Sequence, residues 1–330
     1  MNSLASIIIV VYNHRKYIGA CIDSILAQEY PHEILIVDNS SQDGSADFVA
    51  KNYPQIKLIR SAKNIGYGAG NNLGVSFAKG RYIVILNPDI VVEKGWLEEL
   101  IKPLTSEERL ITTPKILIHD GSLINTCGNL NHFTGLTFTR CLGADPEENN
   151  QLMPVSGVSG ACFALVKENY LDLGGFDEKF FLYNEDADLS WRAHLKDYCI
   201  LFVSSSVIRH EYSLRVSPIK IYHLEKGRYI IIRKYLSYGD IVKLLPSLIV
   251  VEALTFAYAS KHGWTGLKLK SQALFDGMTC NVEKISGNKK NLFNSLSCSI
   301  PLDQLTDNGA ERTFKLLSNI LFEYNFKAIK

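Results

Sequence analysis

The sequence predicts an α/β protein with a mixed sheet and flanking helices, because strand and helix patterns alternate through its first hundred residues. Two apolar runs, residues 6–12 and 82–86, lack the polar alternation of a half-exposed strand. Such runs are typical of strands that are buried on both faces of a parallel sheet. Short connections between the strand and helix patterns predict right-handed crossovers between parallel strands.

The first half of this sheet follows from the order of the patterns. Apolar residues at helical spacing over residues 17–26 predict a helix that packs through one face. A strand is expected at residues 33–37, a short helix up to Tyr53, and a third strand at residues 56–59. A further helix is expected to end near Ala78, just before the strand at residues 82–86. Farther along, separate strands are expected at 199–203 and 207–208.

Polar residues follow three of these strands where each one ends. They are Tyr12 and Asn13, Asp38, and the segment Asn87-Pro88-Asp89. Ligands of open α/β sheets bind at the carboxyl ends of strands. Pro88 ends the ladder and stiffens the loop, and the carboxylate of Asp89 suits a hard cation that also binds substrate phosphates. An ordinary strand-end turn explains each segment singly, because Asp and Asn are common turn residues.

The glycines at residues 68, 70 and 74 have two interpretations. Their spacing, GxGxxxG, is close to the dinucleotide fingerprint of NAD(P)-dependent oxidoreductases. However, that fingerprint occupies the tight turn directly after a strand, and here residues 61–64 intervene. The alternative is that small residues allow a helix to approach the sheet closely.

Composition restricts the class of protein. The chain has 330 residues, 46% of them hydrophobic, and a formal net charge of +1. This composition is that of a folded protein and gives no support for nucleic-acid binding. The seven cysteines form no CxxC pair, which argues against a zinc ribbon and favours reduced thiols in a cytosolic protein. The first residues lack the basic and cleavage regions of a signal peptide.

An acidic segment, Asn184-Glu185-Asp186-Ala187-Asp188, opens a predicted helix. Acidic residues are favourable at a helix N-terminus, and Asp188 can pair with Arg192 one turn later, so a structural role explains the segment. A catalytic role is the alternative. Two adjacent carboxylates repel each other when both are ionised, which raises the pKa of one of them toward the value that a general base needs.

Several motifs together resemble the inverting glycosyltransferases of family 2, in the rhamnosyltransferase-like branch. They are the strand ending in Tyr12-Asn13, the strand ending in Asp38-Asn39, Asn64-Ile65-Gly66-Tyr67 with Asn71, Leu86-Asn87-Pro88-Asp89, and the run from Ser159-Gly160-Ala161 through Gly175-Phe176-Asp177-Glu178 to Glu185-Asp186-x-Asp188-Leu189-x-x-Arg192. The resemblance implies the GT-A fold, a Rossmann-like nucleotide-sugar domain. It departs from the usual DxD-type motif at Asn87, which removes one negative charge and predicts modest metal affinity.

The resemblance also assigns roles. It implies that Asp38 contacts the nucleotide base, that Asp89 binds Mg²⁺ or Mn²⁺, and that Asp186 is the general base with Glu185 beside it. His210 would complete the metal site, although lone histidines are more often structural. The remaining donor-binding residues that we expect by resemblance are Tyr12, Asn13, Asn64, Gly66, Tyr67, Asn71, Asn87, Pro88, Gly160 and Arg192.

The expected activity is transfer of one sugar from a nucleotide diphosphate sugar to a hydroxyl of a glycan or lipid-linked glycan. By resemblance the donor is dTDP-rhamnose or a UDP sugar, and the absence of a QxxRW sequence favours a single addition over polymerisation. Two alternatives stand beside it. One is a noncatalytic nucleotide-sugar-binding scaffold, and the other is the NAD(P)-binding oxidoreductase.

The sequence predicts a catalytic domain over residues 1–215, with a nucleotide-sugar half (1–105) and an acceptor half (106–215) that includes antiparallel ribbons at 110–143. A helical region follows over residues 216–330, and within it residues 281–308 are polar and loop-like. The apolar run at 241–259 is either a buried helix or a helix lying in a membrane surface. The helical region could also mediate a homodimer. We expect a cytoplasmic protein, soluble or peripheral at the inner face of the cell membrane.

Overall fold

The computed structural model describes residues 3–211 and 216–329. The chain divides into two compact units. We call them the N-terminal unit (Met1–Asn129, Thr139–Ala193 and Asp197–Ser213) and the helical unit (Leu130–Phe138, His194–Lys196 and Leu214–Lys330). The predicted domain boundary after residue 215 lies outside the described residues and stays a prediction.

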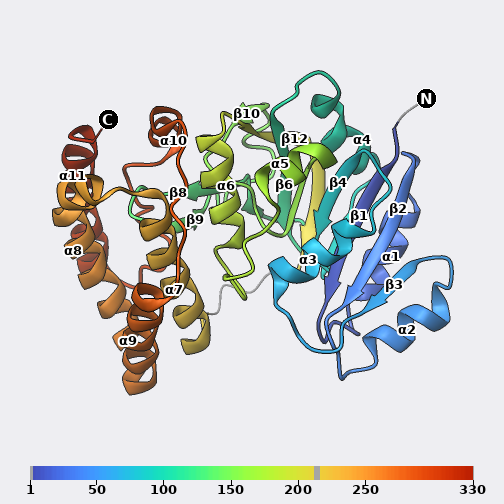
Figure 1. Cartoon of the computed structure of the whole chain (residues 1–330), viewed down its shortest axis with the longest axis horizontal. Helices are drawn as coiled ribbons and strands as arrows, with labels where there is room; N and C mark the ends of the chain where they lie inside the picture. Colours follow the sequence, from blue (N-terminus) through green and yellow to red (C-terminus); the bar gives the residue numbers. More distant parts are fainter. Residues whose placement is uncertain (1–2, 212–215, 330) are drawn as a thin grey trace. The chain divides into compact units, whose positions relative to one another are not determined.

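The N-terminal unit is built on the parallel strands that the sequence predicts (Figure 1). They are β1 (Ala5–Val11), β2 (His32–Asp38), β3 (Lys57–Arg60) and β4 (Tyr82–Leu86), with β1 between β2 and β4. Residues of β1 and β4 are buried throughout, because helices cover both faces of the sheet. The predicted α/β fold is thus confirmed.

Antiparallel pairing completes the sheet beyond β4. In the described part of the chain the strand order is β10-β12-β6-β11-β4-β1-β2-β3. β11 (Cys162–Val166) runs antiparallel to β4, and β12 (Cys199–His210) runs parallel to β6 (Leu110–Ile118). The shorter strands are β5 (Ile90–Val92), β7 (Ile124–Thr126) and β10 (Met153–Pro154) in this sheet, and β8 (Asn129–Asn131) and β9 (Thr137–Thr139) in a separate pair.

Two expectations are corrected here. The segment from Cys199 to Ile208 was predicted as two strands, but it lies within β12, with a register shift between Val203 and Val207. Antiparallel ribbons were expected over residues 110–143. β6 does pair with β7 in that way, yet it also joins the main sheet beside β12. The pairing of β6 with β12 brings β6 into the main sheet. Local patterning cannot predict this pairing, because β12 lies far along the chain from β6.

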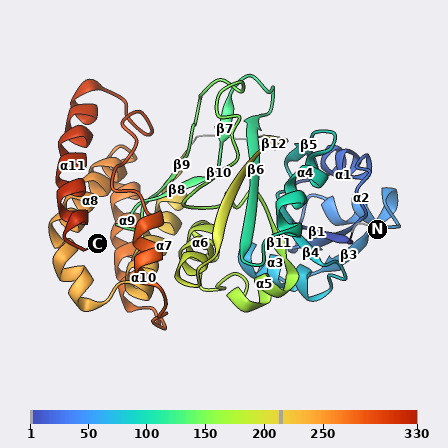
Figure 2. The same ribbon diagram turned by 90° about the horizontal axis from the view of Figure 1, so that it is seen from above.

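Helices pack on both faces of the sheet (Figure 2). One apolar core lies between the sheet and α1 (Ile18–Leu26), α2 (Ser45–Asn52) and α4 (Trp96–Ile101), after which a 3₁₀ turn, η1 (Lys102–Thr105), follows. The other core includes α3 (Tyr67–Ser76), α5 (Lys167–Leu173) and α6 (Glu185–Leu195). Successive residues of β1 alternate between the two cores, as the pleat requires.

The glycines of α3 are packing residues. A Cβ atom at Gly74 would lie 2.3 Å from Ile8, and one at Gly70 would lie 2.9 Å from Val10, both on β1. The three glycines therefore sit inside a helix that lies directly on the sheet, and they do not form a phosphate-binding turn after a strand. The dinucleotide fingerprint interpretation is wrong, because a loop separates β3 from α3 and the three glycines lie within the helix.

The helical unit contains five helices among its described residues: α7 (Pro218–Tyr235), α8 (Tyr238–Ser260), α9 (Gly263–Thr279), α10 (Lys289–Ser295) and α11 (Gly309–Lys327). α8 begins with a capping box between Ser237 and Asp240. α10 lies in the segment that was expected to be loop-like, where the Asn288 side chain caps its first turn. In both cases a local side-chain hydrogen bond fixes the start of the helix.

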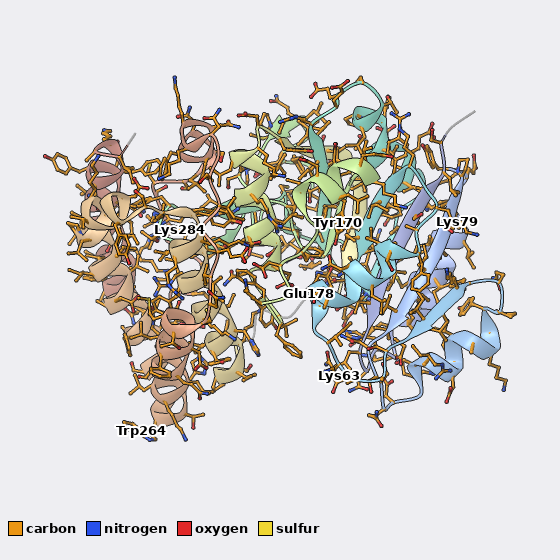
Figure 3. All side chains as sticks on the ribbon, viewed as in Figure 1. Lys63, Lys79, Tyr170, Glu178, Trp264 and Lys284 are labelled. Atoms are coloured by element: carbon orange, nitrogen blue, oxygen red, sulfur yellow. The ribbon has the colours of Figure 1, made fainter. Side chains whose placement is uncertain are left out.

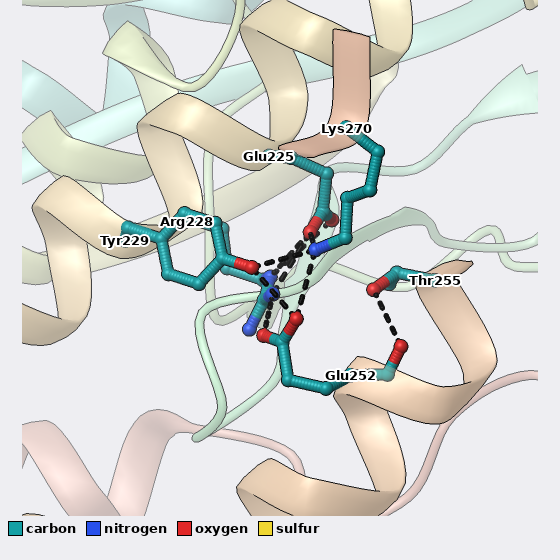
Figure 4. Close-up of polar contacts among 6 residues, drawn as sticks. All are labelled: Glu225, Arg228, Tyr229, Glu252, Thr255 and Lys270. Carbon is teal, nitrogen blue, oxygen red and sulfur yellow. Dashed lines mark hydrogen bonds and ion pairs between the residues drawn. The ribbon is translucent and has the colours of Figure 1, made fainter. Parts of the chain in front are cut away.

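A buried network of charges joins α7, α8 and α9 (Figure 4). The ammonium group of Lys270 on α9 contacts Glu225 on α7 and lies 3.0 Å from Glu252 on α8. Arg228 pairs with the same two carboxylates, and Lys270 also donates to the Tyr229 hydroxyl at 2.6 Å. The two negative and two positive charges thus compensate each other inside the bundle, as buried charges require.

Candidate active site

The carboxyl ends of the parallel strands meet at one edge of the sheet. The register pairs Val11 with Asp38 and places Leu86 beside the first residue of β11, Cys162. The backbone N–H of Asn87 donates to the Ala161 carbonyl at 2.9 Å. The loop Asn87-Pro88-Asp89 therefore lies against the glycine-containing segment that precedes β11.

Asp89 and His210 come together at this edge. β5 starts directly after Asp89 and pairs antiparallel with the end of β12, so that His210 lies opposite Ile90. The His210 Nε2 atom is 3.2 Å from Asp89 Oδ1, and its Nδ1 atom is 3.3 Å from Asn125 Oδ1. Burial alone would raise the pKa of Asp89, but the contact with His210 holds that pKa below its ordinary value. The carboxylate is therefore ionised at neutral pH.

This pair fits a divalent cation. Mg²⁺ takes oxygen ligands at about 2.0–2.1 Å in near-octahedral geometry, so neighbouring ligand atoms lie about 3 Å apart. The 3.2 Å between Asp89 and His210 matches that spacing, and imidazole is also a ligand for Mn²⁺. Among the described residues no group of three or more His, Cys, Asp and Glu side chains is arranged to hold a metal. Substrate phosphates and water commonly supply the other ligands of Mg²⁺ in proteins.

Asn39 organises the loop before α3. Its amide nitrogen donates to Asn64 Oδ1 at 2.9 Å and to the Gly66 carbonyl at 3.1 Å, while its Oδ1 accepts from the Ile65 N–H. Gly66 has φ +88°, and a Cβ there would lie 2.5 Å from the Phe181 carbonyl oxygen, so only glycine fits. The predicted donor-binding residues Asn64 and Gly66 are thus fixed next to Asp38.

Asp186 is held by three hydrogen bonds. Its Oδ2 atom accepts from the Gly160 N–H at 2.9 Å and from the Asn129 side chain at 3.0 Å, and its Oδ1 atom accepts from the Ala187 N–H at 2.8 Å. The Tyr67 hydroxyl donates to the Gly160 carbonyl at 2.6 Å. Burial raises the pKa of Asp186, although these hydrogen bonds act in the opposite direction.

Sequence reasoning missed Asn129. It lies 57 residues before Asp186, on a strand of three residues, and no local pattern relates the two. Its amide orients the carboxylate and supports its ionised form, which is what a general base requires. A polar residue in a short strand gave no signal that distinguished it from its neighbours.

Glu185 differs sharply from Asp186. Burial raises its pKa to about 8, with a further contribution from the charge of Asp186. Its Oε2 atom has no hydrogen-bond partner among the described residues. Glu185 is therefore mostly protonated at pH 7, whereas the three hydrogen bonds to Asp186 favour the ionised form of that carboxyl group.

The remaining predicted residues occupy varied positions. Tyr12 is exposed at the end of β1, Asn13 accepts from the Gln42 N–H at 2.8 Å, and Pro88 is buried. Asn71 is buried in α3 and donates to the Tyr67 carbonyl. The guanidinium of Arg192 is 2.8 Å from Asp188 and donates to the Leu173 carbonyl, so its observed role is to fix α6. The donor contact proposed for Arg192 stays a prediction.

The comparisons with known proteins bear directly on this arrangement. Residues 6–174, just over half of the chain, match the family described as Glycosyl transferase family 2. The chain belongs to this family. The protein is therefore a glycosyltransferase, and this family 2 enzyme uses nucleotide sugars.

Relatives with related activities extend the match. An N-acetylglucosaminyl-diphospho-decaprenol L-rhamnosyltransferase from Mycobacterium tuberculosis is 25% identical over 235 residues, which cover 64% of this chain and 76% of that protein. The fold also resembles that of S. aureus TarS 1–349 in complex with UDP-GlcNAc (TM-score 0.57, 18% identity, 100% of this chain and 93% of the other). GalNAc-T7 with UDP, GalNAc and Mn²⁺ gives a TM-score of 0.60 at 16% identity, over 83% of this chain and 55% of the other.

The two adjacent carboxylates predict different responses to substitution. Because Glu185 is mostly neutral at pH 7, Glu185→Gln should keep sugar transfer within about threefold of wild type at that pH. Wild-type activity should change between pH 7 and 9 as Glu185 ionises beside Asp186, and the variant should not show this change. Initial rates measured from pH 6 to 9 test both points. A hundredfold loss in Glu185→Gln at pH 7 would contradict the assignment.

Stability should follow the same titration. The folded-state pKa of Glu185 lies above its ordinary value of 4.5, so the folded protein binds more protons than the unfolded chain between about pH 4.5 and 8. The contribution of Glu185 to stability therefore falls as pH rises through that interval. Thermal unfolding of Glu185→Gln should show a smaller loss of Tm over this range than wild type.

Proposed function

We propose that the protein is a metal-dependent inverting glycosyltransferase that moves one sugar from a nucleotide diphosphate sugar to a hydroxyl of a glycan or lipid-linked glycan. The observation that carries this proposal is the placement of Asp186, oriented by three hydrogen bonds, beside Gly160 and next to the loop that brings Asp89 to His210. A base and a diphosphate site on one sheet edge are what a single displacement requires. dTDP-rhamnose and UDP sugars are the proposed donors.

In this mechanism the chain first holds the donor. Asp38 accepts from the nucleotide, and the loop fixed by Asn39 lies beside Asp38. Asp186 then removes the proton from the acceptor hydroxyl as its oxygen attacks the anomeric carbon, and the nucleoside diphosphate leaves from the opposite face. Because the bond to the acceptor oxygen forms as the bond to the diphosphate breaks, the anomeric configuration inverts and no covalent glycosyl-enzyme forms.

Asp89 and His210 would hold Mg²⁺ or Mn²⁺. When bound, the cation supplies positive charge that stabilises the leaving diphosphate. The bound Mn²⁺ of GalNAc-T7 supports this part of the proposal. Asn87 in place of an acidic residue keeps the protein's own negative charge at this site small, so a phosphate-bound cation should be favoured over a free one.

A donor panel tests the proposal and predicts the effect of Asp89→Ala. We expect one nucleotide sugar to raise Tm and to be hydrolysed slowly in the presence of Mn²⁺, with both effects lost on chelation. Asp89→Ala removes one of two protein ligands, so it should weaken Mn²⁺-dependent donor binding at least about tenfold. Asp47→Ala, which removes an exposed carboxylate on α2, is the matched control and should behave as wild type.

Two results would contradict the proposal. A metal requirement that is unaltered in Asp89→Ala would remove that residue from the site. No stabilisation by any donor, with or without metal, and no transfer when candidate acceptors are added, would favour the noncatalytic scaffold.

The acceptor and the cellular location belong to the same proposal. The rhamnosyltransferase relative is named for a decaprenyl-linked acceptor, which supports a lipid-linked glycan for this chain. We therefore propose a cytoplasmic enzyme that works at the inner face of the cell membrane. A homodimer through the helical unit is the alternative use of that unit.

A further inference from the structure

α8 carries an apolar stripe on its exposed side. Tyr238, Val242, Leu245 and Ile249 recur at helical spacing and are 83%, 70%, 50% and 60% exposed. The opposite side packs into the helical unit through Leu244, Ser247 and Val251, and Glu252 joins the buried charge network. By length and composition α8 could cross a membrane, yet it also carries these polar packing contacts. The stripe is therefore one face of a packed helix.

α11 packs on the side of α8 that contains Ser247, opposite the stripe, and exposes apolar residues of its own. The two helices pack against each other, since the Ser247 hydroxyl donates to Asn325 Oδ1 at 2.6 Å and the Asn325 amide donates to the Lys243 carbonyl at 2.6 Å. Leu317 and Ile320 of α11 are 60% and 63% exposed. Isolated exposed leucines are ordinary, but four exposed apolar residues in a row along one side of α8 mark an interaction surface.

The outer side of α9 combines an aromatic residue with a basic one. Trp264 projects from the end of the helix (Figure 3) and is 80% exposed. Lys268 follows four residues later on the same side and is also exposed. Tryptophan and tyrosine favour the interface between lipid and water, and lysine favours anionic headgroups.

The charge of the chain is divided unevenly between its two parts. Residues 214–330 contain 17 lysines and arginines against nine aspartates and glutamates, which gives a formal charge of +8. Residues 1–213 contain 18 against 25, which gives −7. Seven of the nine acids in the C-terminal part are already ion-paired within it. The positive excess therefore belongs to the same part of the chain as the stripe, and the negative excess belongs to residues 1–213.

We propose that the exposed stripe of α8 docks the protein on an anionic lipid bilayer. The stripe enters the headgroup region, and the positive charge of the C-terminal part is attracted to anionic lipids. A second copy of the chain is the poorer occupant, because a symmetric contact would bring two regions of charge +8 together. Docking brings the enzyme to the membrane that contains the proposed lipid-linked acceptor. The inference rests on the proposed function only in this respect.

Vesicle co-sedimentation of the full chain, without donor or acceptor, tests the docking directly. We expect binding to phosphatidylcholine vesicles containing phosphatidylglycerol to exceed binding to pure phosphatidylcholine at least about tenfold, with partial release at high salt. Val242→Glu combined with Ile249→Glu should reduce the partition coefficient at least about tenfold. The matched control is Leu152→Glu with Leu171→Glu, at two leucines of the N-terminal unit that are 58% and 61% exposed, and it should bind as wild type.

A second variant separates charge from apolar contact. Lys243→Glu with Lys268→Glu keeps the stripe and should abolish most of the preference for phosphatidylglycerol. Equal sedimentation of the stripe variant and its control would overturn the proposal. So would a dimer in light scattering that Val242→Glu with Ile249→Glu converts to a monomer, because a second copy would then occupy the stripe. Since no donor is present, failure of vesicle binding is distinguishable from failure of donor binding.

Discussion

Asp186→Asn should reduce sugar transfer about a thousandfold or more while the donor still stabilises the protein. The substitution keeps the size of the side chain but replaces one acceptor oxygen by an NH₂ donor, and it removes the ability to accept a proton. General base catalysis is commonly worth about 10²–10⁴-fold in rate, and the adjacent Glu185 is mostly protonated at pH 7, so it is a poor substitute for Asp186 as the base. Transfer rates and donor-induced Tm shifts, measured on the same preparation, give the two readouts.

The adjacent Glu185→Gln variant is the control for Asp186→Asn. Both substitutions convert an acid to its amide at the start of α6, so a general effect on the helix would appear in both. Only the loss of the ionised base should appear in Asp186→Asn. Equal activity of the two variants would remove Asp186 from the reaction, and loss of donor stabilisation in Asp186→Asn would show that the residue binds the donor.

The parts of this site that the sequence predicts are those with a local cause. The apolar run at residues 82–86 must be buried on both faces, so its strand and the polar loop that follows it are readable from the chain alone. The position of His210 depends instead on β12 pairing with β5, a contact between segments about 120 residues apart. Asn129 and Asn39 act through hydrogen bonds to distant residues or loops. Their partners exist only in the folded chain.

Local patterns also misled in identifiable ways. GxGxxxG spacing in α3 arises because β1 lies directly beneath the helix, and close packing selects the same residue that a phosphate loop would select. The apolar composition of α8 suggested either a buried or a membrane-surface helix. Each interpretation has a basis in the structure, because one side of α8 is buried through Leu244 and Val251 and the other side is exposed.

The largest effect on stability should come from Lys270→Met. Lys270 is completely buried, and its ammonium group contacts Glu225, Glu252 and the Tyr229 hydroxyl. Methionine retains most of the side-chain volume but leaves two carboxylates inside the bundle with Arg228 alone. Removing one partner from a buried ion network typically costs about 3–5 kcal/mol, because the remaining charge is neither solvated nor compensated. Chemical denaturation should show this loss of free energy of unfolding.

Two further variants determine whether charge balance causes this loss. Lys268→Met, two residues earlier on α9 at an exposed position, should change stability by no more than about 0.5 kcal/mol. Glu225→Gln added to Lys270→Met removes the uncompensated charge and should recover at least about half of the loss. The pKa of Glu252 lies near 2, below its ordinary 4.5, so wild-type stability should fall as pH drops through that interval. Lys270 is one cause of that depression, so the acid limb should be flatter in Lys270→Met, and an unchanged limb would show that Arg228 alone sets it.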